Sequence, residues 1–270
     1  GDCEKTKEFL SNFNGIKISE PDKGISDAFN KGVIAATGEN VMFLNSGDVL
    51  LSPNYLKEAE TVMNFNPEIS FIHSDSLFED RISGTIYMEP LKSIFFKEAP
   101  LGRGMPYNHL TMIIRKSIFE KIGYFKLHYK ITMDFEWVCR LQKNKFIGHY
   151  FDGEPVVRMD GGGVSSTTEQ LVMWESLKAL TENNLLNPKN LAGILERSVL
   201  YLGRIMLETL GMNKTLGWLK RKKHNSNWTN SSALGLKNNF FDVKTRPEQI
   251  FPTTVPPNRG LFSKKRMGLN

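Results

Sequence analysis

One short polar segment stands directly after an apolar run that is typical of a buried strand. Asn45, Ser46, Gly47 and Asp48 follow the apolar residues 41–44. Ligands of open α/β sheets bind outside the carboxyl ends of the strands, where an acidic loop can hold a divalent cation that neutralises a diphosphate. The same four residue types are the commonest formers of ordinary turns, and taken alone the segment favours a turn.

A glycine-containing loop, residues 20–24, precedes a stretch with helical spacing that begins near Ser26. Gly24 at the start of a helix lets backbone N–H groups face an anion, and Lys23 adds positive charge. Together with Asp22 these residues are candidates for binding a diphosphate. A solvated loop that Ser26 caps explains the pattern equally well.

Two acids open a third segment, in which Asp134 and Glu136 precede Arg140 on an expected helix. Transfer of a group to a hydroxyl needs a carboxylate that removes the hydroxyl proton as the oxygen attacks. Both acids are therefore candidates for a catalytic base. The alternative is structural, because Asp134 suits a helix N-cap and Glu136 suits the first turn of a helix.

A histidine, His109, follows Asn108 in an irregular part of the sequence. A histidine in such a place can bind a phosphate, a sugar hydroxyl or a metal. A single loop histidine is more often structural or simply solvated, so this candidate depends on the others.

The elements that must position these residues follow from hydrophobic periodicity. The pattern predicts helices over 25–36, 53–63, 117–122 and 133–142, and strands over 41–44, 69–72 and 147–151. Residues 41–44 are apolar throughout, which predicts a strand covered on both faces, as in a parallel sheet. Ser52 and Pro53 are expected as the N-cap and first residue of their helix. The alternation indicates an α/β sheet with right-handed crossovers.

The organisation of the chain changes after residue 170. Residues 171–219 are expected to be helical, with a break near Asn187-Pro188, and beyond Lys223 the chain is rich in Asn, Ser, Pro and basic residues. We therefore expect a catalytic core over 1–170, a helical extension over 171–222 and a poorly ordered basic tail over 223–270. The chain leads straight into a helix, so the core is expected to be incomplete at its N-terminal side.

The composition narrows the classes of partner. The 270 residues include 35 Lys and Arg against 29 Asp and Glu, a net charge of +6 that suits an anionic partner such as a diphosphate or a membrane surface. Aromatic residues are not interleaved with the basic clusters, which argues against nucleic acid. The two Cys and five His form no zinc pattern, and no apolar run reaches the ~18 residues of a membrane span. Cys139 is expected to be a buried free thiol, which fits a cytoplasmic protein.

Taken in order, these segments resemble glycosyltransferase family 2, and in particular the bacterial branch that builds capsular, colanic-type and O-antigen polysaccharides. The resemblance covers roughly residues 1–170. It rests on Ser19 to Gly32, Ala36 to Glu39, Phe43 to Asp48, Met105 to His109, Arg115 to Ser117, Asp134 to Trp137 with Arg140, and Gly162 to Ser165.

The resemblance implies a GT-A fold, a Rossmann-like mixed sheet flanked by helices, here with a C-terminal helical extension. It implies an inverting transfer from a nucleotide-diphosphate sugar to a hydroxyl of a saccharide or lipid-linked saccharide, of the hexosyltransferase type. Asp134 falls at the family's catalytic base, with Glu136 as the second choice, and Asp75 faces donor or acceptor. Asp48 would hold Mg²⁺ or Mn²⁺. The residues expected to bind the donor diphosphate are Asp22, Lys23, Gly24, Asn45, Asp48 and His109.

The sequence departs from the family at the metal motif, since Asn45 and Gly47 stand where carboxylates are common. This departure supports a second hypothesis, a non-catalytic GT-A-like binding or scaffolding protein. The helical extension also allows two interpretations. It packs on the core, or it lies at the inner face of the membrane as an amphipathic segment. That segment would comprise Leu200, Ile205, Leu207, Leu210, Leu216, Trp218 and Leu219, followed by the basic residues 221–223.

Overall fold

The architecture is known from a computed structural model, which describes residues 4–80, 85–89, 100–151, 154–161, 168–212, 215 and 228–230. The chain divides into two compact units, residues 1–229 and residues 230–270. Asn230 is the only described residue of the second unit, so the account concerns the first. The tail expected over 223–270 lies outside the described residues except for 228–230.

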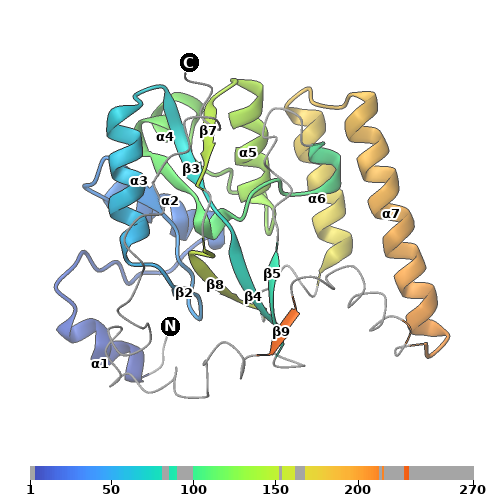
Figure 1. Ribbon diagram of the computed structural model, residues 1–270, viewed down its shortest axis with the longest axis horizontal. Coiled ribbons are helices and arrows are strands. Elements are labelled where there is room, and N and C mark those ends of the chain that lie inside the picture. The colour runs from blue at the N-terminus through green and yellow to red at the C-terminus, as the bar shows by residue number, and fades with distance from the viewer. Residues whose placement is uncertain are drawn as a thin grey trace. The chain divides into compact units, whose positions relative to one another are not determined.

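Two mixed β-sheets form the centre of the first unit (Figure 1). The first has the order β1 (Asn40–Met42), β6 (Ile113–Arg115), β3 (Ile69–His73), β7 (Ile147–Tyr150). The second has the order β2 (Val49–Leu50), β8 (Val157–Asp160), β4 (Ser76–Asp80), β5 (Thr85–Glu89), β9 (Trp228–Asn230). The pairs β3–β7 and β4–β8 are parallel, whereas β1–β6, β3–β6, β2–β8 and β4–β5 are antiparallel.

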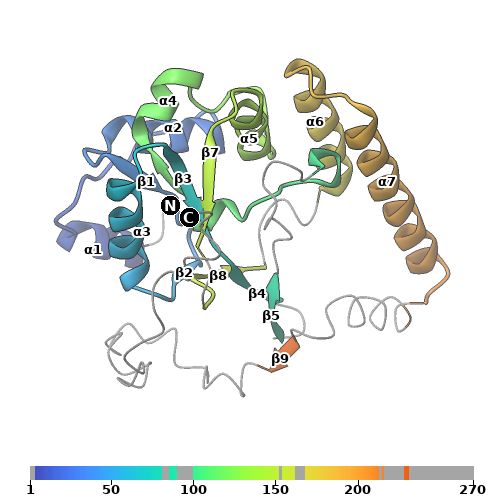
Figure 2. The same ribbon diagram turned by 45° about the horizontal axis from the view of Figure 1, so that its top comes forward.

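Helices lie on both sides of the first sheet, with α3 on one side and α5 on the other, and α6 and α7 beyond α5 (Figures 1 and 2). Their bounds are α1 (Glu4–Asn12), α2 (Ile25–Ala35), α3 (Asn54–Phe65), α4 (Lys116–Ile122), α5 (Met133–Lys143), α6 (Glu169–Glu182) and α7 (Pro188–Thr209). Two 3₁₀ turns, η2 (Leu101–Arg103) and η3 (His109–Thr111), precede β6. The expected α/β fold with a mixed sheet flanked by helices is what the structure shows.

The two faces of the first sheet bury two separate cores. On strand β6, Ile114 points into a core shared with α2, α4, α5 and α6, while Ile113 points into a core shared with α3. This alternation follows from the pleat of a strand, which sends successive side chains to opposite faces. Cys139, a free thiol on α5, is fully buried in the first core as expected.

Two local predictions are wrong, and each has a physical reason. The strand expected over 41–44 is shorter, ends at Met42 and lies at one end of the first sheet's order, so it is not covered like a central parallel strand. Helix α3 begins at Asn54 with Pro53 in the N-cap position, and no side chain caps it. The predicted cap Ser52 acts through its backbone carbonyl, which accepts from the N–H of Tyr55 at 3.1 Å.

The predicted break between the two C-terminal helices is confirmed. The Asn187 side chain caps α7 by accepting from the N–H of Asn190 at 2.8 Å, and Pro188 occupies the first turn. Proline is favoured there because it needs no hydrogen-bond partner for a backbone N–H.

The strand directions gather the candidate residues at one edge of the first sheet. Strands β1 and β3 run the same way because both pair antiparallel with β6, and β7 is parallel to β3. The carboxyl ends of β1, β3 and β7 therefore meet the start of β6. Helix α5 precedes β7 and runs antiparallel to it. The N-terminus of α5 therefore lies at the same edge of the sheet.

Candidate active site

His109 stands at the centre of the candidate site. Its ring packs against Phe29 of α2 and Phe43, which follows β1, with centroid distances of 5.6 and 5.0 Å, and these two phenylalanines also stack on each other at 4.8 Å. Its Nε2 atom is buried and, within the described part of the chain, has no hydrogen-bond partner. Burial lowers the pKa of His109, and the negative charges of Asp134 and Asp48 only partly oppose this effect. The imidazole is therefore neutral at pH 7 and lies within electrostatic reach of both acids.

Asp48 lies in the loop after β1, next to a second acid that the sequence analysis missed. Its carboxylate accepts from the N–H groups of Asp160 at 2.9 Å and Asn45 at 3.2 Å. Burial and the negative charge of Asp160 nevertheless raise the pKa of Asp48. Asp160 closes β8 directly before three glycines, and an acid in front of a glycine run was the available signal. Two neighbouring carboxylates that repel each other form a donor set that fits a hard divalent cation.

Gly47 allows this approach of the two acids. Its φ angle is +95°, and a Cβ atom placed on it would stand 2.6 Å from Oδ2 of Asp160. We expect Gly47→Ala to lower the free energy of unfolding by about 1–3 kcal/mol, because the backbone would be strained and the loop displaced. Chemical denaturation measures this change.

The matched control is Gly203→Ala on α7, where a Cβ meets nothing within 4 Å. There the substitution is expected to stabilise the helix by about 0.5–1 kcal/mol. If Gly47→Ala is as stable as the parent chain, the close packing of this loop is not as described.

The two acids at the start of α5 have different surroundings. Glu136 is fully buried, and its carboxylate binds Arg140 at 2.9 Å and Lys126 at 2.9 Å and accepts from Asn183 at 3.3 Å. Asp134 is half-buried, and its Oδ1 atom accepts the N–H of Phe135 at 2.8 Å. Among the described residues its Oδ2 atom has no hydrogen-bond partner. Asp134 is therefore the acid with an oxygen available for proton transfer.

Arg140 explains why Glu136 is held so firmly. Its guanidinium donates to the carbonyl oxygens of Ile122, Gly123 and Tyr124, which form the turn after α4. The Glu136–Arg140 pair therefore joins α5 to the end of α4. A buried ion pair of this kind is strongly destabilised when one partner is removed.

The acidic side chains in and next to the loop before α2 are paired with a lysine of the same helix. Lys31 pairs with Asp22 at 2.8 Å and Asp27 at 3.2 Å, and the N–H of Lys23 donates to Asp27 at 2.9 Å. Gly24, with a φ angle of +124°, takes the N-cap position of α2. The Asp27 carboxylate thus occupies the place at the helix start where a ligand anion was expected. The loop reaches the site through Phe29, five residues further along α2.

A tyrosine and an acid lie at the ends of the neighbouring parallel strands β7 and β3. The Tyr150 hydroxyl donates to Oδ2 of Asp75 at 2.7 Å. His73, which pairs with Tyr150 in the register of β3 and β7, is buried beside Tyr107, with ring centroids 4.6 Å apart. Its burial lowers the pKa of His73 to about 3, so this histidine stays neutral. The pairing of Tyr150 with Asp75 extends the polar edge from β1 across to β7.

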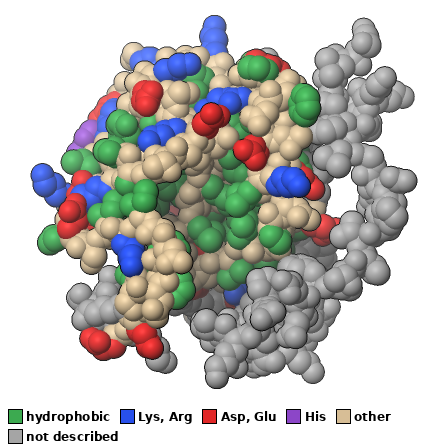
Figure 3. Space-filling model, turned by 90° about the vertical axis from the view of Figure 1, so that its left-hand side faces the viewer, with side chains coloured by type: hydrophobic (Ala, Val, Ile, Leu, Met, Phe, Trp, Pro, Cys, Tyr) green, Lys and Arg blue, Asp and Glu red, His purple; other side chains and the backbone are tan. Residues whose placement is uncertain are grey.

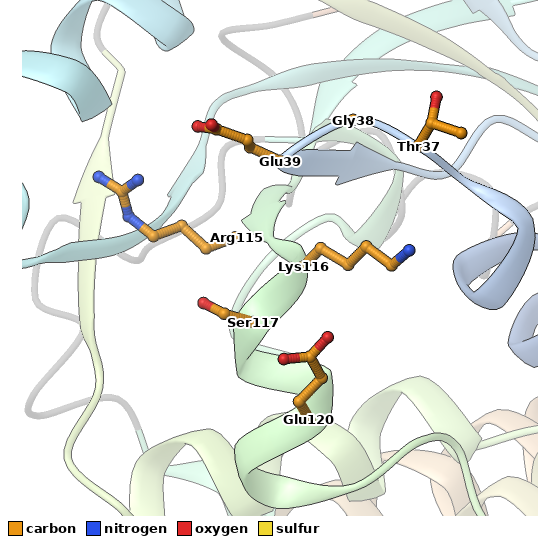
Figure 4. Close-up of a pocket in the computed structure, with 7 residues that line it drawn as sticks. All are labelled: Thr37, Gly38, Glu39, Arg115, Lys116, Ser117 and Glu120. Atoms are coloured by element: carbon orange, nitrogen blue, oxygen red, sulfur yellow. The ribbon is translucent and has the colours of Figure 1, made fainter.

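A pocket of about 360 Å³ opens at the opposite edge of the sheet, around Thr37 to Glu39 and Arg115 to Glu120 (Figure 4). Its two cations are already engaged by backbone oxygens. Arg115 donates to the carbonyls of Met63 and Ile69, and Lys116 donates to the carbonyl of Ala36. These bonds complete the ends of α3 and α2, so the pocket has a structural explanation.

No group of three or more His, Cys, Asp or Glu side chains in the described ranges is arranged to hold a metal ion. Likewise, none of the helices that are described has the length and apolar character needed to cross a bilayer.

Comparisons with known proteins add the following. No family model matches the chain. A PGL/p-HBAD biosynthesis glycosyltransferase of Mycobacterium tuberculosis is 23% identical over 207 residues, which cover 75% of this chain and 74% of that protein. An uncharacterized glycosyltransferase of the same species is 28% identical over 126 residues, 45% of each chain. The sequence is thus similar to glycosyltransferases along most of its length.

Solved structures show the fold. The crystal structure of S. aureus TarS matches with a TM-score of 0.50 and 15% identity over 72% of this chain and 35% of that one. Residues 1–349 of TarS in complex with UDP-GlcNAc match with a TM-score of 0.50 and 14% identity over 72% of this chain and 59% of that one. The chain thus spans between about a third and three fifths of these structures. Together the comparisons support a glycosyltransferase relationship and confirm the mixed α/β fold, which is similar to that of TarS.

Proposed function

We propose that this protein is an inverting glycosyltransferase of family 2, which transfers a sugar from a nucleotide-diphosphate donor to a hydroxyl in bacterial polysaccharide synthesis. The observation that supports the proposal most is the placement of His109 at the carboxyl edge of the sheet, where the negative charges of Asp134 and Asp48 both act on its pKa. Glycosyltransferase relatives and the fold of a protein that was crystallised with UDP-GlcNAc agree with it.

Asp134 is the base in this proposal. Its Oδ2 atom takes the proton of the acceptor hydroxyl, the hydroxyl oxygen bonds to the anomeric carbon, and the nucleoside diphosphate leaves with the electrons of the broken bond. Attack and departure occur on opposite faces of the sugar, so the anomeric configuration inverts. Glu136 is excluded from this role in the proposal because its carboxylate is committed to Arg140 and Lys126.

The departing diphosphate needs compensating positive charge. Asp48 and Asp160 would hold Mg²⁺ or Mn²⁺, which neutralises the diphosphate when it is bound. Asn45 fixes the loop, since its N–H donates to Asp48. His109, kept neutral by burial, offers a hydrogen bond to the diphosphate rather than a permanent charge. Lys23 remains a candidate for a further contact from the α2 side.

Calorimetric titration of UDP and of GDP into the chain, with and without Mn²⁺, tests the proposal. We expect one of the two nucleotides to bind, and to bind more tightly when Mn²⁺ is present. If neither nucleotide binds to the folded chain under either condition, a donor site for these nucleotides does not exist at this edge.

A contact with the inner face of the membrane is the second part of the proposal. Six side chains, five of α7 and one of its C-cap, are between 48% and 66% exposed and form one apolar face that we name the α7 stripe. They are Leu191, Leu195, Val199, Leu202, Met206 and Leu210. The other side of α7 packs on η2, where Gly193 lies so close to Arg103 that a Cβ would stand 2.9 Å from its backbone nitrogen. The stripe therefore points away from the core.

The stripe differs from the face expected from sequence. Leu200 and Leu210 are exposed, but Ile205 and Leu207 are half-buried. Leu216, Trp218, Leu219 and the basic run over 220–223 lie outside the described residues.

Charge favours an anionic surface as the partner of the stripe. Glu196 and Glu208 of α7 are paired with Arg103 and Arg204, and four consecutive basic residues follow at 220–223 in the sequence. Basic residues next to an apolar face bind anionic lipids. Hydrophobic side chains also gather around a hollow on the side that carries α1 and α3 (Figure 3).

Leu202→Glu is expected to weaken binding to vesicles of anionic phosphatidylglycerol by about tenfold, because it replaces a leucine that inserts into the bilayer. Sedimentation with vesicles measures the bound fraction, and neutral phosphatidylcholine vesicles give the charge dependence. Leu56→Glu, on α3, is the matched control at a leucine 45% exposed. If Leu202→Glu binds like the parent chain while the protein dimerises through α7, the stripe is a protein interface.

A further inference from the structure

A short segment, residues 125–132, directly precedes the helix that carries Asp134. We name it the base-proximal segment. It has no helix or strand of its own, so apart from the bond from the N–H of Tyr129 to the carbonyl of Lys126 at 3.3 Å, its backbone groups need partners outside the segment. The position of Asp134, two residues beyond the segment, therefore depends on what holds the segment in place.

Glu175 of α6 is the main partner of this segment. Glu175 is only 2% exposed. One carboxylate oxygen accepts the N–H of Lys130 at 2.8 Å. The other accepts the N–H groups of Ile131 at 3.1 Å and Thr132 at 2.9 Å and the hydroxyl of Thr132 at 3.0 Å. A single side chain thus binds three consecutive backbone donors.

This arrangement replaces the ordinary start of a helix. Thr132 occupies the N-cap position of α5, yet its side chain makes no capping bond and instead donates to Glu175. A carboxylate before a helix N-terminus is also favoured by the helix dipole. Burial alone would raise the pKa of Glu175, but the hydrogen bonds from residues 130–132 outweigh it and lower that pKa below its ordinary value of 4.5. The group is therefore ionised at neutral pH, as these bonds require.

Helix α2 holds the same segment from the other side. Asn30 forms a reciprocal pair with the backbone of Phe125, donating to its carbonyl at 2.8 Å and accepting from its N–H at 2.9 Å. The Ser26 hydroxyl donates to the carbonyl of Tyr129 at 3.2 Å. The segment is thereby fixed between the helix that touches His109 and the helical extension.

We propose that Glu175 is a positioning residue, which sets the start of α5 so that Asp134 meets the acceptor hydroxyl in the geometry that proton transfer needs. This inference rests on the proposed glycosyl transfer. It makes α6 an integral part of the active site, although α6 belongs to the region that the sequence analysis treated as an extension outside the core. Glu175 is buried, so in this proposal its effect is transmitted through residues 130–132.

Glu175→Gln tests the inference, since an amide keeps the size of the side chain but has one acceptor oxygen instead of two. We expect kcat for sugar release from the donor to fall by about 10²-fold, because small misplacements of a catalytic group have effects of this size. Nucleotide affinity by calorimetry should stay unchanged. Amide hydrogen exchange at residues 130–132 should accelerate. Glu175→Asp, which keeps both acceptor oxygens, should recover part of the lost kcat.

Leu180→Val is the control for a purely structural role, because it loosens the buried face of the same helix and leaves the Glu175 carboxylate in place. Rates are compared well below each variant's melting temperature. The inference is overturned if Glu175→Gln turns over at the rate of Leu180→Val. Should Glu175→Gln not fold, the same comparison is made with Glu175→Asp. If the parent chain releases no sugar from any donor, it is the proposed function that fails, and with it the need for a positioned base.

Discussion

Asp134→Asn should lower the rate of sugar transfer by about 10²–10⁴-fold while the affinity for the nucleotide stays the same. A positioned general base contributes rate enhancements of this size, and an amide cannot take the proton. The substitution replaces one carboxylate oxygen of residue 134 by an amide nitrogen of similar size, so the packing around it changes little. The hydrogen bond from the N–H of Phe135 to Oδ1 can be kept. Steady-state kinetics with saturating donor, together with calorimetry of nucleotide binding, measure the two quantities separately.

Glu136→Gln is the control that distinguishes the base from its neighbour. It leaves Arg140 and Lys126 next to a neutral side chain in a buried site, which is expected to cost about 3–5 kcal/mol of stability. The folded fraction should still turn over. The roles of the two acids are reversed if folded Glu136→Gln is inactive and Asp134→Asn remains active.

Asp48→Asn should remove the gain in nucleotide affinity that Mn²⁺ provides, an effect of about 10²-fold or more. The reason is that a cation supplies several kcal/mol of charge stabilisation to a diphosphate, and Asp48 with Asp160 would hold it. Titration of the nucleotide with and without Mn²⁺, on the parent chain and the variant, gives the difference directly.

The control for Asp48 is Glu120→Gln, an acid that lines the pocket at the opposite edge of the sheet. It should leave the Mn²⁺ effect intact. An unchanged Mn²⁺ effect in Asp48→Asn would mean that the cation site lies elsewhere, and a parent chain with no Mn²⁺ effect would mean that the site works without a cation.

The sequence predicted the elements whose signals are local. The strand predicted over 69–72 is confirmed as β3, Ile69 to His73, all five residues of which are buried, as is typical of a strand covered on both faces. The break at Asn187-Pro188 was equally clear, because an asparagine cap and a proline act within a few residues. The start of α5 was placed correctly by its apolar spacing, although its N-cap is Thr132 rather than Asp134.

What the sequence did not reveal depends on partners that are far apart along the chain. The bond between Asp160 and Asp48 joins residues 112 positions apart, and Glu175 reaches its partners across 43 to 45 positions. The surroundings that distinguish Glu136 from Asp134 also depend on Lys126 and Asn183, which no local pattern connects to Glu136. The sheet order had to be known before these residues could be assigned to one edge.

The central claim is tested most directly by proton NMR of the chain with Mn²⁺ and a panel of α-linked UDP-sugars and GDP-sugars that includes UDP-GlcNAc, with water as the acceptor. We expect one donor to be consumed and the released sugar to appear first as the β-anomer, before mutarotation mixes the two forms. Release of the α-anomer would contradict inversion. Binding of a nucleotide without consumption of any donor would contradict the transferase itself and favour a binding protein that has kept the fold.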